Sequence, residues 1–388
     1  MRPVRRTFSI ATEPLEALFW ILLLPVAWCF AGYPLAMLLR ARLRPLPPPR
    51  ETGEVEDGAS VVLAVRDGAD LLQGRVADLL AQEGVREVLV ACNGCADGTE
   101  AVAAELAARE PRVRVLVSPA AEGKAGAVNR GVAAAAGEVV VLADARQRFA
   151  PGAVRALLAA FRDPAVGVAS GRLVVRAAEG AVEGVRLYWG AEGRLRMAES
   201  RTGSVVGATG AIYAVRRSRY LPIPPGTILD DVLVPMRIAR GGARVVVAPE
   251  AVAYDLPAAG ARAEYRRKRR TAAGNLQLLR SDPWLLSPRA NPLLLRYLSH
   301  KLLRLAAPLC LAGATVAAAA LPGAGYRAFF LAMSALYLYG AAGLAVRLPL
   351  SPVPAAFVMM HGAVLAALLR ARDDAAALWI PSAGPVRP

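Results

Sequence analysis

Residues 137–151, GEVVVLADARQRFAP, contain the pattern that decides the fold. After a glycine turn, residues 139–142 form a continuous apolar run, which is typical of a strand buried on both faces of a parallel sheet. The run ends at one carboxylate, Asp144. Open α/β folds bind ligands at the carboxyl edge of the sheet, where such a residue lies. We therefore expect Asp144 to belong to a binding site.

Strand and helix patterns alternate around this run. Strands are expected at residues 60–65, 87–91 and 113–118, and helices at 69–83, 99–109 and 124–136. This alternation predicts an α/β fold with a doubly wound, mostly parallel sheet. A Pro-rich stretch, RPLPPPR at residues 44–50, precedes it as a spacer.

The chain is unusually apolar, with 55% hydrophobic residues among 388. The excess is concentrated in four stretches, each close to the roughly 20 residues that span a bilayer, at residues 15–39, 302–321, 328–346 and 353–369. The first is followed by arginines and by no small-residue cleavage site, so we interpret it as an anchor. The segment 291–304 mixes leucine with basic residues, which predicts an amphipathic helix at headgroup level.

The net charge of +16 raises the question of a nucleic-acid partner. The basic residues gather beside the apolar stretches, as juxtamembrane residues attracted to anionic lipid do. Aromatic residues make up only 6%, too few to suggest a stacking platform for single strands. We therefore expect membrane lipids and no nucleic acid as partners.

Two glycine-containing turns lie at the starts of predicted helices. ACNGCADGT, residues 91–99, permits a tight turn with free backbone amides, but an ordinary loop with Asp97 as a helix cap explains it equally well. Its CNGC unit resembles half a zinc or redox site, without a second CxxC. EGKAGAVNRG, residues 122–131, places Lys124 at a helix start, where its amine would contact either phosphate or only solvent. The segment does not have the residue spacing of a P-loop.

Carboxylates provide the remaining candidates. Asp144 is an oxygen donor suited to a hard divalent cation that bridges two phosphates. TILDDVLVP, residues 227–235, contains adjacent Asp230 and Asp231, and repulsion between them favours a raised pKa suited to general-base catalysis. The alternative is a helix N-terminus, where paired acids interact favourably with the dipole.

Taken together, the order of these segments resembles the membrane-bound family 2 glycosyltransferases, inverting enzymes with the GT-A fold that include polysaccharide synthases and ceramide glucosyltransferase. GKAGAVNRG is similar to the family's GKAxALNxG, LADAR to its DxD segment, and LDDV to its [ED]D pair. GATGAIYAVRR, residues 207–217, looks like its acceptor-side loop and helix. The resemblance covers nearly the whole chain, from the N-terminal anchor to the C-terminal apolar helices.

The resemblance implies a role for each matching residue. Nucleotide-binding positions would be Val65, Asp67, Asn93, Asp97, Lys124, Asp144 and Arg146. Asp144 would also bind Mg²⁺ or Mn²⁺, and catalysis would involve Asp231 as general base, with Asp230 beside it. The family's (Q/R)xxRW motif matches Arg267 and Arg270, or, one residue earlier, Arg266 and Arg269. A cation there would stabilise the diphosphate leaving group.

Three motifs depart from the family pattern. Arg146 replaces the second aspartate of DxD, Cys92 and Asn93 replace the base-reading carboxylates, and Thr271 replaces the tryptophan. The first leaves fewer carboxylates for a metal ion. The second prevents simple transfer of uridine specificity, although asparagine still has a donor and an acceptor for a base edge. The third weakens the case for processive synthesis.

The sequence thus predicts an inverting glycosyltransferase that uses a nucleotide-diphosphate sugar and a lipid or lipid-linked glycan acceptor, in cell-envelope, exopolysaccharide or glycolipid synthesis. A degenerate membrane scaffold remains an alternative, and a transporter is a lesser one because the apolar helices have almost no carboxylates. The expected location is the cell membrane, multi-pass, with a cytoplasmic catalytic domain. The expected divisions are an anchor 1–44, a linker 45–58, a GT-A domain 59–286, an interfacial helix 287–304, membrane helices 305–372 and a tail 373–388.

Overall fold

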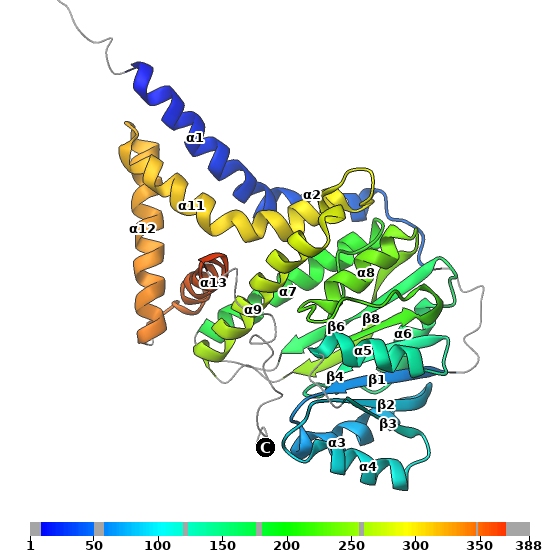
Figure 1. The fold of residues 1–388 in the computed structure, drawn as a ribbon. Helices are drawn as coiled ribbons and strands as arrows, with labels where there is room; N and C mark the ends of the chain where they lie inside the picture. Colours follow the sequence, from blue (N-terminus) through cyan, green and yellow to red (C-terminus); the bar gives the residue numbers. More distant parts are fainter. Residues whose placement is uncertain are drawn as a thin grey trace, which may run out of the picture.

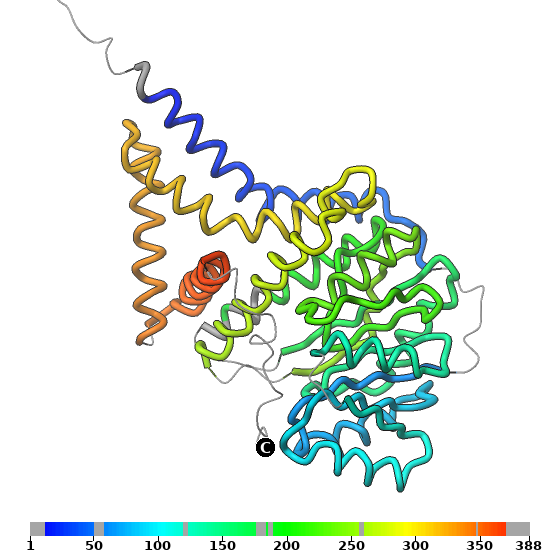
Figure 2. The backbone as a smooth tube through the Cα atoms, viewed as in Figure 1, coloured from blue at the N-terminus to red at the C-terminus, as the bar shows by residue number. Residues whose placement is uncertain are grey.

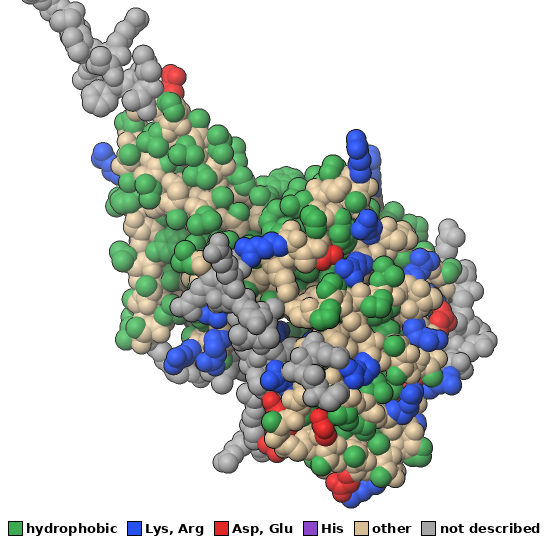
Figure 3. All heavy atoms as spheres, in the orientation of Figure 1, with side chains coloured by type: hydrophobic (Ala, Val, Ile, Leu, Met, Phe, Trp, Pro, Cys, Tyr) green, Lys and Arg blue, Asp and Glu red, His purple; other side chains and the backbone are tan. Residues whose placement is uncertain are grey.

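The computed structural model describes residues 9–49, 58–118, 123–175, 181–255, 260–346 and 348–369. The predicted tail 373–388 and most of the predicted linker lie outside these ranges. An α/β domain occupies the middle of the chain, and long apolar helices from both ends pack together beside it (Figure 1). In Figure 3, hydrophobic side chains cover the long helices, whereas charged side chains gather on the α/β domain.

One mixed sheet of eight strands forms the centre of the domain, in the order β3-β2-β1-β4-β7-β6-β8-β5. The strands are β1 Ala59–Val65, β2 Val85–Asn93, β3 Val113–Ser118, β4 Val139–Asp144, β5 Arg148–Phe149, β6 Val166–Val175, β7 Ile212–Arg216 and β8 Arg244–Asp255. Strands β3, β2, β1 and β4 are parallel, and β7 is antiparallel to both β4 and β6. This arrangement confirms the predicted α/β class.

The strand order reverses between β1 and β4. The chain proceeds outward from β1 to β2 and β3, then returns to the other side of β1, where Ala64 is in register with Asp144. The loops that leave two parallel strands at such a reversal diverge, and the crevice between them is where doubly wound sheets bind ligands. The topology therefore places the end of β4 in the expected binding region.

Helices cover both faces of the sheet. The helices α3 Ala69–Leu80, α4 Thr99–Arg109 and α6 Ala153–Ala160 pack on one face, and α5 Gly123–Ala134 and α8 Asp230–Arg240 pack on the other. Both faces of β1 and β4 are consequently buried, which explains their unbroken apolar sequences. Two further long helices, α7 Ala181–Arg201 and α9 Ala261–Ser281, lie between the sheet and the apolar helices. Short 3₁₀ turns follow β7 and α9, at η2 Arg217–Arg219 and η3 Pro283–Leu286.

Gly131 allows α5 to lie close to β1. A Cβ atom at this glycine would be only 2.3 Å from Cγ1 of buried Val62, whose branched side chain has little freedom to move. We expect Gly131→Ala to lower the free energy of unfolding by about 1–3 kcal/mol, as overpacking does, measured as the apparent melting temperature in detergent. Gly325→Ala is the control, because its Cβ would meet no atom within 4 Å; equal melting temperatures for both variants would contradict this prediction.

Within the described residues, four helical stretches are long and apolar enough to cross a membrane: Thr12–Leu43, Leu294–Ala320, Ala324–Ala345 and Pro352–Leu369. They comprise α1 Ser9–Ala27, η1 Trp28–Gly32, α2 Tyr33–Leu43, α10 Leu294–Tyr297, η4 Leu298–Leu302, α11 Leu303–Ala320, α12 Ala324–Ala345 and α13 Pro352–Leu369. Helices α1 and α11 run side by side, although they come from opposite ends of the chain (Figure 2). The segments η1 and η4 are π-helical turns.

The predicted separate interfacial helix differs from the structure. Residues 294–302 continue directly into α11, and their polar side chains contact the α/β domain. Arg296, for example, donates hydrogen bonds to the backbone oxygens of Glu199, Thr202 and Ser204. Arg296 and His300 are therefore satisfied by protein groups, which the amphipathic pattern did not distinguish from lipid headgroups.

A buried ionic cluster links the apolar helices to α7. His300 contacts Glu192 through Nε2 at 2.6 Å and Glu199 through Nδ1 at 2.9 Å. Arg304 also contacts Glu192, at 2.7 Å, and the Tyr33 hydroxyl donates to Glu199. We call these five residues the junction cluster. Since α2, α7 and the η4–α11 helix each contribute to it, the cluster fixes the position of the α/β domain against the apolar helices.

Candidate functional site

Three of the predicted residues form a continuous ionic chain at the sheet edge. Lys124, at the start of α5, lies 3.0 Å from Asp144 at the end of β4 and 3.2 Å from Asp230 at the start of α8. Burial alone would lower the pKa of the Lys124 amine, but the two carboxylates more than offset it and raise the pKa overall. Lys124 therefore keeps its positive charge, and the Asp144 side chain, 37% exposed, stays open to a ligand.

Asp231 lies beside this chain in a cradle built by the loop Gly207–Gly210. The Ala208 N–H donates to the Asp231 backbone oxygen at 2.6 Å. A Cβ atom at Gly210 would lie 2.9 Å from Asp231 Oδ2, so only glycine leaves room for the carboxylate. Gly207 has a φ of +79°, which favours glycine there as well. The acceptor-side segment of the sequence thus packs directly on the predicted general base.

Burial, followed by the neighbouring Asp230 carboxylate, raises the pKa of Asp231 above its ordinary value of 3.8. Asp230 itself forms an ion pair with Lys124. It also accepts a hydrogen bond from the Tyr213 hydroxyl, which lies 3.1 Å away. The two acids therefore differ in surroundings: Asp230 is fully engaged, whereas Asp231 keeps its carboxylate for another partner. A raised pKa makes a carboxylate a stronger base near neutral pH.

The rate of a reaction that needs ionised Asp231 depends on pH in a definite direction. Because the folded-state pKa is raised, the acidic limb of kcat/KM is expected to lie above pH 3.8, and the rate falls as pH drops through that limb. Initial rates measured between pH 4 and 8 would show it. A Lys124→Met enzyme, which removes a neighbouring cation, should shift the limb further upward, and an unshifted or downward-shifted limb would contradict the electrostatic argument.

The arginines of α9 also reach this edge. Arg267 pairs with Glu264 at 2.8 Å and lies 3.6 Å from Asp255 at the end of β8. Burial raises the pKa of Asp144, whereas the nearby positive charges lower it overall. Lys124 makes the largest of these contributions, and Arg270 is close enough to add to it. These contacts place Arg267 and Arg270 toward the sheet, in preference to the alternative pair Arg266 and Arg269.

The Arg270 Nε–H is buried without a hydrogen-bond partner among the described residues. A buried unsatisfied donor on a cation is costly, so such a group favours an anionic ligand. Arg146, at the second DxD position, pairs with Asp255 at 2.7 Å and also lowers the pKa of Asp144. Because Arg146 stands where the family has an aspartate, the charge around Asp144 is more positive. Asp144 is then the one carboxylate of the LADAR segment.

Two loops at the ends of β1 and β2 bind each other. Asp67 Oδ1 accepts from the Ala96 N–H at 2.8 Å, and Asp97 Oδ2 accepts from the Ala69 N–H at 3.0 Å. Asp97 also accepts from the Thr99 N–H at 3.0 Å. Burial raises the pKa of Asp97, but these backbone hydrogen bonds lower it overall. The N-cap of α4 is Gly98, and the bonds of Asp97 hold both loops at the crevice.

Val65 and Asn93, at the ends of the same two strands, are buried. Cys92 is also buried, which raises the pKa of its thiol to about 12 and keeps it protonated at neutral pH. The structure therefore presents the expected nucleotide-side residues as a firmly held pair of loops beside Asp144. Cys92 and Asn93 are both fully buried, so neither side chain is exposed at the crevice.

Two residues of the site were missed from the sequence. Asp255 joins Arg146 and Arg267, and Tyr213 bonds to Asp230. Asp255 ends a long strand just as Asp144 ends β4, and this repetition of the pattern is the one signal that would have identified it. Tyr213 lies within an apolar strand and carries no comparable signal.

Comparison with known proteins identifies the type of domain. Residues 60–220 match the family described as Glycosyl transferase family 2. The chain contains a family 2 glycosyltransferase domain. The matched region begins in β1 and includes Lys124, Asp144 and the Gly207–Gly210 loop, so most of the glycosyltransferase site lies within it. Asp231, Arg267 and Arg270 follow it in the chain and reach the site through the fold.

Solved structures resemble the glycosyltransferase beyond this domain. The mannosyltransferase PcManGT from Pyrobaculum calidifontis, solved with GDP-Man and Mn²⁺, is 23% identical, with a TM-score of 0.68 over 92% of this chain and 99% of that one. The shared fold therefore includes the apolar helices as well as the GT-A domain. No curated protein matches the chain significantly.

Two further similarities are more distant. Mannosyl-3-phosphoglycerate synthase from Rubrobacter xylanophilus is 20% identical, with a TM-score of 0.43 over 61% of this chain and 80% of that one. GalNAc-T7, solved with UDP, GalNAc and Mn²⁺, is 17% identical, with a TM-score of 0.40 over 51% of this chain and 44% of that one.

Proposed function

We propose that this glycosyltransferase moves one sugar from a nucleotide-diphosphate donor to a lipid or lipid-linked glycan, with inversion at the anomeric carbon. The observation that carries this proposal is the chain from Asp144 through Lys124 to Asp230, which ends beside Asp231. It places cationic groups and a free carboxylate at one crevice. The first would bind a diphosphate, and the second would accept a proton from the acceptor.

In the proposed reaction, Asp231 takes the proton from an acceptor hydroxyl as its oxygen attacks the anomeric carbon. The bond from that carbon to the diphosphate breaks on the opposite face, and the nucleotide diphosphate leaves with the electron pair. Lys124 and Arg270 stabilise its developing negative charge. The unpaired Nε–H of Arg270, described above, supports this role because it offers a buried donor to an anion.

A divalent cation, Mg²⁺ or Mn²⁺, would be held by Asp144. No group of three or more His, Cys, Asp or Glu side chains that could hold a metal occurs in the described part of the chain. The donor set nevertheless fits a cation that takes one carboxylate from the protein and its other oxygens from diphosphate and water, as Mg²⁺ commonly does. Such a cation neutralises diphosphate charge, and Arg146 would contribute to the same end.

The proposed location is the cell membrane, with the catalytic domain on the cytoplasmic side. The four apolar helices support membrane attachment. The complex of PcManGT with a nucleotide sugar supports this donor class. An active site held beside a bilayer by the junction cluster would meet acceptors that are themselves membrane-bound.

A donor screen tests the proposal. Purified protein in lipid nanodiscs is mixed with UDP-, GDP- or dTDP-sugars, Mg²⁺ or Mn²⁺, and a membrane lipid extract, and nucleotide release and donor binding are both measured. We expect one donor class to bind and to be turned over only with metal present. If no donor binds, the nucleotide-sugar assignment is wrong, and a degenerate scaffold becomes the better account of Arg146, Asn93 and Thr271.

A further inference from the structure

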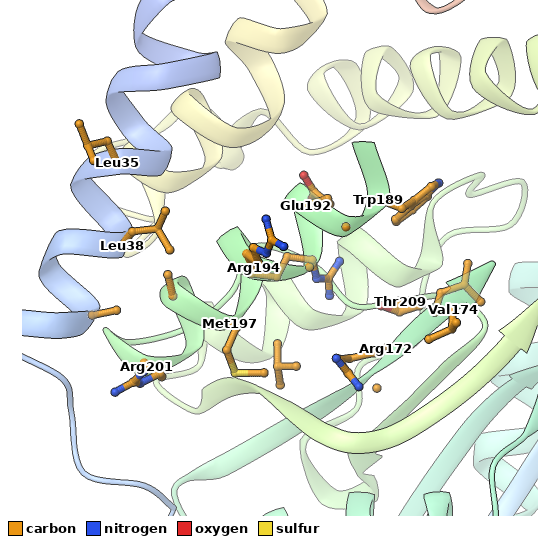
Figure 4. Close-up of a pocket in the computed structure, with 18 of the residues that line it drawn as sticks. Leu35, Leu38, Arg172, Val174, Trp189, Glu192, Arg194, Met197, Arg201 and Thr209 are labelled. Atoms are coloured by element: carbon orange, nitrogen blue, oxygen red, sulfur yellow. The ribbon is translucent and has the colours of Figure 1, made fainter. Parts of the chain in front are cut away.

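A cavity of about 810 Å³ lies between α2, α7 and β6, outside the donor crevice. Leu35 and Leu38 from α2 stand on one side of it and Arg172 and Val174 from β6 on the other, with side chains of α7 between them (Figure 4). Its volume falls in the range of sites that enclose small molecules. The donor-binding residues described above are not part of its lining.

The cavity has a strong excess of positive charge. Five arginines line it, against one carboxylate: Arg42, Arg172, Arg194, Arg196 and Arg201. That carboxylate, Glu192, is already bound to His300 and Arg304. The side chains of Arg42, Arg194 and Arg201 have no hydrogen-bond or ion-pair partner among the described residues. Unpaired guanidinium groups around one space match a phosphate, which they bind through paired hydrogen bonds.

The other side of the cavity is apolar and belongs to a membrane-type helix. Leu35, Leu38 and Leu39 line it, and each is more than 40% exposed. They lie in the last turns of the candidate span Thr12–Leu43, immediately before Arg40 and Arg42. The cavity therefore combines a leucine surface continuous with a membrane helix and a cationic surface continuous with the α/β domain. Only an amphiphile satisfies both surfaces.

One lining residue of the cavity directly precedes the glycine that packs on the proposed general base. Thr209 lines the cavity, and the next residue is Gly210, the glycine on which the Asp231 carboxylate packs. Arg196, another lining residue, donates to the backbone oxygens of Gly207 and Ala208 and so holds the same loop. Thr209 and Gly210 thus connect the lining of the cavity to the Asp231 carboxylate.

We propose that this cavity binds the acceptor, and that the acceptor is a lipid whose apolar tail is joined through phosphate or diphosphate to the group that receives the sugar. The inference rests on the proposed function, because it assigns the acceptor of that reaction. The tail lies along the leucines of α2, the phosphate lies among the arginines of α7 and β6, and the hydroxyl beyond it reaches Asp231. The anionic group binds here to position the acceptor and takes no part in bond breaking.

Binding of three simple compounds tests the charge and tail requirements separately. Farnesyl diphosphate carries both, farnesol carries the tail alone, and inorganic diphosphate carries the charge alone. The full chain in detergent is titrated with each, and so are an Arg194→Gln/Arg201→Gln variant and a control, Arg109→Gln, whose exposed arginine lies on α4. Melting temperatures verify that all three proteins are folded, and binding of nucleotide sugars is measured on the same samples.

We expect farnesyl diphosphate to bind about tenfold or more tightly than either other compound, because charge-assisted hydrogen bonds add to apolar burial. The double variant should lose this advantage and the control should keep it. Equal binding of farnesol would overturn the phosphate requirement, and equal binding of inorganic diphosphate would overturn the lipid requirement. An unaffected double variant would overturn the cavity as the site. If nucleotide sugars fail to bind, the proposed function falls, and this acceptor assignment falls with it.

Discussion

Asp231→Asn is expected to reduce glycosyl transfer by about 10²- to 10⁴-fold, the usual contribution of a general base. Asparagine keeps the shape that fits against Gly210, but its amide takes no proton from an acceptor hydroxyl. The carboxylate proposed to hold the donor's metal ion is Asp144, and its contact with Lys124 does not involve Asp231. Transfer should therefore fall while donor binding stays within about twofold. Both are measured on the same preparation, once the donor screen has identified a substrate.

The matched control for this experiment is Asp70→Asn, which makes the same chemical change at an exposed position in the first turn of α3. Its activity should equal that of the original enzyme. Full activity of Asp231→Asn would refute the assignment of the base. Loss of donor binding together with activity would instead place Asp231 in the donor site, and the mechanism would have to be rewritten.

Glu199→Ala is expected to have the largest effect on stability. Its carboxylate accepts from Tyr33 and contacts His300 at 2.9 Å, and it is fully buried. Removing one partner of a buried ionic network leaves the others uncompensated, which costs about 3–5 kcal/mol of unfolding free energy. The apparent melting temperature in detergent should fall by several degrees. Loss of the attachment of α7 to the apolar helices should also expose that helix to limited proteolysis.

Glu105→Ala provides the comparison, because this glutamate forms an ion pair with Arg109 at the surface of α4 and is 59% exposed. Exposed pairs contribute roughly 0–1 kcal/mol, so its melting temperature should barely change. A melting temperature for Glu199→Ala close to that of Glu105→Ala would show that the junction cluster contributes little to stability.

The parts of the site that could be predicted are those set by local sequence. An apolar run that ends in Asp144, a glycine-flanked Lys124 and an adjacent pair of aspartates each identify themselves within ten residues. The sheet topology then brings these segments to one edge, and the ionic chain between them follows. The predicted roles of these residues remain predictions, since geometry alone shows only that they meet.

The junction cluster and the cavity could not be predicted in this way. His300 contacts glutamates more than 100 positions away in the chain, and the cavity needs α2, β6 and α7 together. Periodicity describes one face of one helix and leaves its partner undetermined. The basic residues of 291–304 were consequently assigned to lipid headgroups, whereas Arg296, His300 and Arg304 contact the α/β domain.

The two π-helical turns have a consequence for comparing this chain with its relatives. Segments η1 and η4 contact each other, and Trp28 donates to the Ser299 hydroxyl at 2.9 Å. A π-turn contains one residue more than an α-turn, and each residue advances a helix by about 100°. The extra residue in η4 thus rotates the faces of the helix that precede and follow residues 298–302 by about 100° relative to each other. Aligning this chain with a relative that has an uninterrupted helix here would require a one-residue gap within residues 298–302.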